Sequence, residues 1–312
     1  MKLFITILSV SFLFSNQSFA LVDYTESGNA PVVQSAPSMP ASVPAIRSKA
    51  SRSSARSSAS SNASISLKTR YESINVSTQG EDAEGQVGLV GMNAKIDTGY
   101  NFYLDLDYWQ ASTTANGISD SNSYQAGNPK FLLGFNWFQF GNSSNAVRAD
   151  IYAGMSLKGE SAIAHSRNDK IVGLHSSKKF VDFVLLVGGE FIITGAPKNS
   201  DEMAVGNITK LVAGLGWIVS DDIRFALNAK RYAVGQAETD YVGNRLKSDI
   251  SFSVLNPSLL LNITPAVGLE LGAYFRTKRA SSKDGENLLD ARLMEHTGSY
   301  GNTLYSSLNI GI

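Results

Sequence analysis

The chain has 312 residues, and its 27 basic side chains are balanced by 27 acidic ones. This length allows one large or two ordinary domains, and the balanced charge gives no reason to expect a nucleic-acid partner. The sequence contains no cysteine, which excludes disulfides, thiolate metal sites and a lipid-anchored N-terminal cysteine.

The first twenty residues have the pattern of a secretory signal peptide. Lys2 is followed by a mostly apolar run over residues 3–14, and Ser18 and Ala20 place small residues where a signal peptidase reads them. The apolar run is short for a membrane-spanning helix, which needs about 20 residues, so an uncleaved anchor is the less favoured alternative. We therefore expect residues 1–20 to be removed on export.

Residues 21–63 are expected to form a disordered periplasmic tail. Ser, Ala and Pro are abundant in this segment, and large apolar side chains are rare. Such a segment cannot bury enough surface to offset its chain entropy. Four side chains make it locally basic: Arg47, Lys49, Arg52 and Arg56. They suggest contact with an anionic polymer such as peptidoglycan, or with the barrel lumen, although a solvated spacer is the favoured interpretation.

From Ile65 onward the dominant pattern is alternation of apolar and polar residues. It is clearest over residues 102–109, 147–158, 223–230 and 267–276, where one face is apolar and the other carries charges, Gly and Tyr. Each segment has about the ten residues that a tilted strand needs to cross a bilayer. The pattern predicts an all-β fold over residues 64–312, a transmembrane, antiparallel, up-and-down β-barrel.

The connections fall into two classes that alternate along the chain, as in outer-membrane barrels with tight periplasmic turns and long external loops. Short turn signals lie at 97–99, 141–145, 220–222 and 264–265. Long polar loops lie at 79–85, 111–128, 159–169, 195–204, 235–247 and 280–298.

We count about twelve strands, with both chain ends in the periplasm. The segment 170–194 is divided into a short strand at 170–175, a turn at 176–179 and a strand at 180–194. Without that turn the count falls to about ten.

Aromatic residues and the chain end add to this prediction. Trp137 and Trp217 each precede a short turn on the apolar face of a strand, where an interfacial aromatic girdle should lie. At the chain end, one face of the last strand carries Leu304, Leu308, Ile310 and Ile312. This strand resembles the C-terminal signal read by the bacterial barrel-assembly machinery, although that signal usually ends in Phe.

The whole region resembles Gram-negative outer-membrane β-barrels of the small channel or porin-like class. The resemblance implies a place in the outer membrane, with its lipid and the assembly machinery as partners. A soluble β-sandwich or a lipocalin-type barrel, with its apolar face in a core, is the structural alternative.

Charged residues on the inward parity should line the lumen, because charges in a barrel must face water or pair with one another. They are Lys68, Arg70, Glu72, Lys95, Asp105, Asp107, Lys130, Arg148, Asp150, Asp182, Glu190, Lys210, Arg224, Lys230, Glu270, Arg276 and Lys278. Antiparallel pairing should place Asp107 opposite Lys130. We favour a narrow passive channel for small solutes. A structural or surface-interaction barrel without an open pore is the alternative, and an outer-membrane hydrolase is less favoured.

The histidines offer little sign of chemistry. His165 and His296 fall in expected external loops, His175 lies near an expected turn, and no two have metal-ligand spacing on one strand or helix. His175 and Ser177 have the separation used by outer-membrane phospholipases, but two lysines follow and no partner Asn is evident. We therefore expect no catalytic site, no metal site and no cofactor.

Overall fold

The computed structural model describes residues 63–77, 82–98, 101–114, 124–142, 145–238, 243–281 and 288–311. The expected signal peptide and nearly all of the expected tail lie outside these residues. Within the described ranges, no helix is long and apolar enough to cross a membrane.

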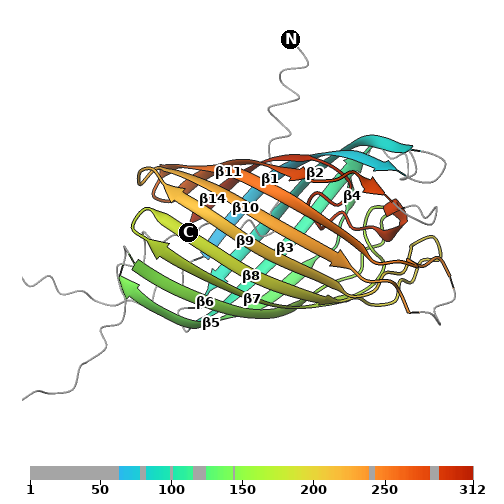
Figure 1. Ribbon diagram of the computed structural model, residues 1–312, viewed down its shortest axis with the longest axis horizontal. Helices are drawn as coiled ribbons and strands as arrows, with labels where there is room; N and C mark the ends of the chain where they lie inside the picture. The colour runs from blue at the N-terminus through green and yellow to red at the C-terminus, as the bar shows by residue number, and fades with distance from the viewer. Residues whose placement is uncertain are drawn as a thin grey trace, which may run out of the picture.

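Twelve long strands among the described residues form one closed antiparallel barrel, as the sequence predicts (Figure 1). They are β1 (Ala63–Ser77), β2 (Asp82–Asp97), β3 (Phe102–Thr113), β5 (Lys130–Asn142), β6 (Asn145–Ser156), β7 (Asp169–Phe180), β8 (Phe183–Ile193), β9 (Ile208–Ile218), β10 (Ile223–Val234), β11 (Ile250–Thr264), β12 (Val267–Arg276) and β14 (Thr303–Gly311). Each long strand pairs with its two neighbours, and β1 pairs with β14 to close the barrel. Two short strands lie beside β3 and β1, namely β4 (Gln125–Ala126) and β13 (Ala280–Ser281), and one short 3₁₀ helix, η1 (Leu288–Ala291), lies in the last long connection.

One predicted turn is misplaced. The sequence places it at residues 176–179, but β7 continues to Phe180 and the reversal occurs at Val181 and Asp182. Both faces of β7 are polar near this end, so Ser176 to Lys179 have the composition of a turn while they still pair with β8. The hairpin exists, so the count is twelve strands and not ten.

The outer surface of the barrel is apolar, which rules out the soluble alternative. Leu227 is 51% exposed and Leu133 57% exposed, while their neighbours on the other parity, Asn228 and Leu132, are buried. Exposed aliphatic side chains of this kind recur on the outer face of the strands. A band of such residues is suited to contact with lipid chains.

Aromatic side chains ring the end that carries the short turns. Trp217 stacks on Phe183 of β8 at a centroid distance of 6.4 Å and lies equally close to Phe225 of β10. Trp137, at a β-bulge of β5, is 59% exposed and contacts the Phe138 ring edge-on. This girdle, together with the apolar band, makes the chain an outer-membrane type of barrel.

Tyrosines inside the barrel lie over glycines of the adjacent strand, which explains the frequency of both residues on the inward parity. Tyr152 is the register partner of Gly173, and Tyr305 is the register partner of Gly272. At both glycines an added Cβ would overlap the tyrosine ring. The absence of a side chain lets the ring lie flat on the wall, which helps to fix the strand register.

Candidate functional site: the lumen and its external cap

The middle of the lumen holds a network of buried, paired side chains. Lys210 Nζ on β9 lies 3.4 Å from Glu190 Oε1 on β8, and the Tyr152 hydroxyl donates to Glu190 Oε2 at 2.8 Å. On the opposite wall, Lys68 Nζ lies 3.9 Å from Glu270 Oε2. All four charged side chains are less than a tenth exposed. Charges this deeply buried are tolerated because each has a partner of opposite sign.

A second group of inward charges lies along one wall and is partly exposed. These residues, which we call the charged wall, are Lys95, Asp105, Asp107, Lys130 and Arg148 of β2, β3, β5 and β6. The register pairs Asp107 with Lys130 near the long-loop end, as the sequence predicts, and pairs Lys95 with Asp105 nearer the short turns. Arg148 forms an ion pair of 2.9 Å with Asp150 at the short-turn end. The charged wall therefore extends along most of the lumen.

The remaining strand residues of the expected lumen set also lie inside the barrel. Arg70 and Glu72 on β1 form an ion pair of 3.6 Å. Arg224 and Lys230 on β10 are buried, and the Lys230 ammonium lies 4.7 Å from the centre of a tyrosine ring on β12. Arg276, at the end of β12, is partly exposed.

Two expected lumen residues lie elsewhere. Asp182 is exposed in the β7–β8 turn, because the reversal comes later in the chain than the sequence suggests. Lys278 is exposed beyond the end of β12, where its backbone carbonyl accepts a hydrogen bond from the Arg276 side chain. Both residues fall on the inward side only if the alternation of a strand is continued past the point where that strand ends.

The long connections gather at one end of the barrel and pack on one another there (Figure 1). We call the described parts of four of them the external cap: residues 157–168, 194–207, 243–249 and 288–302. The cap has its own buried apolar side chains, namely Ile163, Met203, Leu246, Leu288, Leu289, Leu293 and Met294. Loops that bury apolar side chains together form a structured lid and not a solvated fringe.

Buried ion pairs tie the loops of the cap to one another. Arg167 Nη1 lies 2.7 Å from Glu202 Oε1, and the other oxygen of this carboxylate accepts the Ser166 backbone N–H at 2.6 Å. Arg292 Nη2 lies 2.6 Å from Asp201 Oδ2. The loops that follow β6, β8 and β12 are thereby linked.

The segment 288–302 is also attached to the lumen wall. The Arg70 side chain donates to the Met294 carbonyl, and Arg276 Nη1 donates to the Gly298 carbonyl at 3.1 Å. The Tyr300 backbone N–H donates to the Glu72 carboxylate at 3.4 Å. The cap is therefore held inside the mouth by polar contacts with charged lumen residues.

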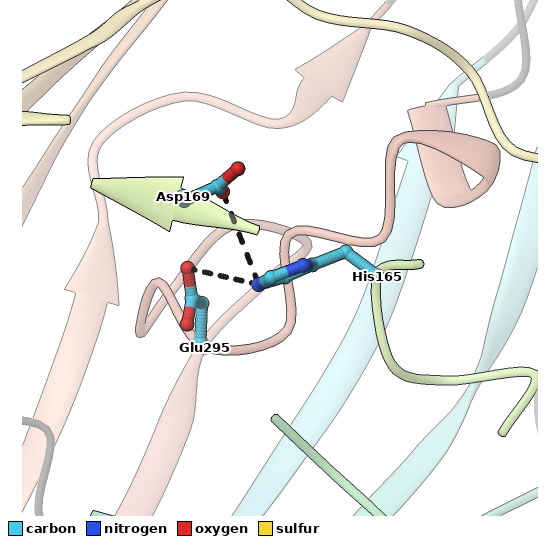
Figure 2. A group of neighbouring side chains, drawn as sticks. All are labelled: His165, Asp169 and Glu295. Atoms are coloured by element: carbon cyan, nitrogen blue, oxygen red, sulfur yellow. Dashed lines mark ion pairs between the residues drawn. The ribbon is translucent and has the colours of Figure 1, made fainter. Parts of the chain in front are cut away.

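A compact group of titratable side chains lies where the cap meets β7. Figure 2 shows the His165 imidazole directed between the carboxylates of Asp169 and Glu295, and its Nε2 lies 3.9 Å and 3.6 Å from them. His165 and Asp169 are fully buried. Burial raises the pKa of the Glu295 carboxyl, but the adjacent His165 and His296 imidazoles and the Lys130 ammonium together outweigh burial and hold this pKa well below its usual range. Burial lowers the pKa of the neighbouring His296 to about 4.

Sequence reasoning missed these cap residues because it treated the long loops as solvated. His165 and His296 are buried, and His175 faces the lumen in mid-strand, 3.3 Å from the Tyr152 hydroxyl, and not near a turn. One signal was available in the last loop. Its segment 288–294 contains four large apolar residues, which is unusual for a loop in water.

No protein-family model matches the chain, and no curated protein matches it. Ninety chains of solved structures match. The outer membrane protein OprD from Pseudomonas aeruginosa is 8% identical, with a TM-score of 0.38, over 81% of this chain and 93% of that chain. The translocator domain of the autotransporter NalP from Neisseria meningitidis is 10% identical, with a TM-score of 0.41, over 82% and 89%. Outer-membrane expressed OmpT of Vibrio cholerae is 9% identical, with a TM-score of 0.37, over 80% and 97%. The closed strand pairing, and not these resemblances, establishes the barrel.

Proposed function

We propose that this barrel is a narrow passive channel for small polar or charged solutes, constricted at its external end by the cap. The charged wall is the observation that carries the proposal. It combines both signs of charge, extends along most of the lumen and is partly exposed. Charged side chains inside a membrane protein are costly, and they commonly mark the path of an ion or a polar solute.

The attachment of the cap is consistent with a constriction that limits passage. The segment 288–302 meets the wall through hydrogen bonds from Arg70 and Arg276 and to Glu72. Each such bond to a charged group contributes only about 1.5–3 kcal/mol net. A segment held in this way narrows the mouth without being a permanent part of the wall.

Planar-bilayer recordings on the refolded protein test the proposal. We expect a small, steady single-channel conductance from the natural chain. A variant in which residues 288–301 are replaced by a short Gly-Ser linker should conduct several times more, because the constriction is removed while the twelve strands remain. Heat-modifiable migration on gels would show that both proteins are folded. Silence from both folded proteins would refute the channel.

A structural or surface-interaction barrel is the second candidate, and the buried central network favours it. Glu190, Lys210, Lys68 and Glu270 are nearly inaccessible and paired with one another, as in a lumen that side chains fill. In that case the loop-replacement variant should remain silent and should only lose stability.

We further propose that the protein acts without catalysis and reaches the outer membrane through a cleaved signal peptide and the barrel-assembly machinery. His175, whose spacing from Ser177 is that of outer-membrane phospholipases, lies in the lumen beside the Tyr152 ring, tilted against it at a centroid distance of 4.8 Å. Intact-mass measurement of the mature protein tests the export step, with Leu21 expected as the first residue. Contact of the basic tail with peptidoglycan is testable by co-sedimentation with purified sacculi.

A further inference from the structure

A hydrogen bond made by Nδ1 fixes the orientation of the His165 ring. His165 Nδ1 lies 2.9 Å from the Arg167 carbonyl oxygen, which can only accept, so Nδ1 carries the proton of this hydrogen bond. Nε2 is then the nitrogen that faces Asp169 and Glu295. Histidines that bind metal ions commonly have this arrangement, with one N–H held by a carbonyl and the other nitrogen available.

If the imidazole is neutral, the hydrogen bonds around Nε2 do not relieve the repulsion between this nitrogen and the two carboxylates that it faces. Among the residues that the structure describes, only the Ser156 hydroxyl, at 3.2 Å, can donate to Nε2. The same hydroxyl lies 3.1 Å from Glu295 Oε2, and it has one proton for both. A lone pair would then face two carboxylate oxygens. A cation among the three groups removes this repulsion.

The separations are closer to those of ligands around an ion than to hydrogen bonds. Nε2 lies 3.6 Å and 3.9 Å from the two carboxylate oxygens, and the three ligand atoms lie within 4.8 Å of one another. A good N–H···O bond is about 2.7–3.2 Å long. Ligands about 2.1 Å from a tetrahedral zinc ion are about 3.4 Å apart, so a small adjustment of side chains would close this site around an ion.

His296 supplies a second and independent observation. Its side chain is more than nine-tenths buried, its Nε2 has no hydrogen-bond partner, and this atom lies 3.5 Å from Glu295 Oε1. A buried imidazole nitrogen left without a partner is costly. It is directed at the same carboxylate oxygen as His165, so it can approach an ion there or contact a water bound to it.

Arg167 is the competing cation, since its Nε lies 3.1 Å from Asp169 Oδ2. Arg167 also pairs with Glu202, and Arg292 Nη1 lies 4.0 Å from that carboxylate. The two guanidiniums thus face Asp169, Glu202 and Asp201, and Glu295 makes a fourth carboxylate. The positive charge of Lys130 also favours the ionised form of Glu295, but Lys130 has Asp107 as its register partner. A carboxylate oxygen has two lone pairs and can accept from Arg167 while it binds an ion. A divalent cation would balance the charge that remains.

We infer that His165, Asp169 and Glu295 form a binding site for one divalent transition-metal ion of the Zn²⁺ class. One imidazole nitrogen and two carboxylate oxygens are ligands that suit this class of ion. The ion would join the loop after β6 to the segment 288–302 and so fasten the cap. The inference does not depend on the channel proposal, because metal binding is measured without conductance.

The test is calorimetric titration of Zn²⁺ into the refolded full chain, stripped of metal with EDTA. We expect one ion per chain. His165→Gln and Glu295→Gln should each weaken binding at least tenfold. His175→Gln is the matched control, because His175 is also buried but lies away from the cluster, and it should bind as the natural chain does.

X-ray absorption at the zinc edge of the natural chain is independent of whether the variants fold. We expect nitrogen and oxygen neighbours with the scattering pattern of at least one imidazole. Absence of stoichiometric binding, binding that survives in both folded variants, or a spectrum without imidazole would each overturn the site. The cluster would then be an ion-pair network centred on a protonated His165.

Discussion

Replacing Leu227 by Arg should destabilise the barrel far more than replacing Ile223 by Arg, although both residues lie on the outer face of β10. Ile223 is the first residue of the strand, beside a short turn, and Leu227 is 51% exposed four residues further along. Four residues span about 13 Å at about 3.3 Å each. With a tilt of about 40°, that is about 10 Å along the membrane normal, close to the middle of an apolar band about 25 Å tall.

The depth sets the expected cost. Arg on the lipid face costs about 2–4 kcal/mol at the midplane and about 0–1 kcal/mol near the interface. The two variants should therefore differ by about 2–3 kcal/mol in free energy of unfolding, which is about 30- to 150-fold in the folding equilibrium. Guanidinium unfolding from lipid vesicles, followed by tryptophan fluorescence, measures this difference. Equal costs for the two variants would refute the assignment of this face to lipid.

Three further perturbations test the interior and the chain end. Gly173→Ala should destabilise the barrel by about 1–3 kcal/mol in the same unfolding assay, because the new Cβ overlaps the Tyr152 ring; an unchanged midpoint would contradict this packing. Glu190→Gln should lower the free energy of unfolding by about 3–5 kcal/mol, because it leaves Lys210 buried without its carboxylate partner. A smaller loss than that caused by Gly173→Ala would indicate that water reaches this pair. A chain that starts at Ser64 should keep the heat-modifiable gel shift, since residues 21–63 lack apolar content; its loss would give the tail a role in folding.

The strand count was predictable because an alternating pattern with a lipid face on one side leaves a strong signature. Shifting the pairing register of a strand by one residue would place each of its lipid-facing side chains in the lumen. The misplaced β7 turn shows the limit of this signal. Residues 176–179 have no apolar member, so alternation disappears there, although the backbone keeps its pairing with β8.

The external cap was not predictable in the same way. Its contacts join side chains from separate loops, such as Ser156 and Glu295, which are 139 positions apart. No period relates such residues, so the acids and histidines of the loops resemble solvated side chains in the sequence. The local excess of leucine and methionine over residues 288–294 indicates burial, but it does not reveal the partners.

The seam between β1 and β14 has a consequence for how the molecule is made. Thr69 and Ser306, which hydrogen-bond across it, are 237 positions apart. Until the last strand is delivered, β1 and β12 each present a row of unpaired backbone groups, and such edges readily pair with other chains. Contacts between such distant residues also form slowly, because the chain entropy is lost before the pairing is gained. The interval before closure is therefore the stage at which this chain is most exposed to aggregation.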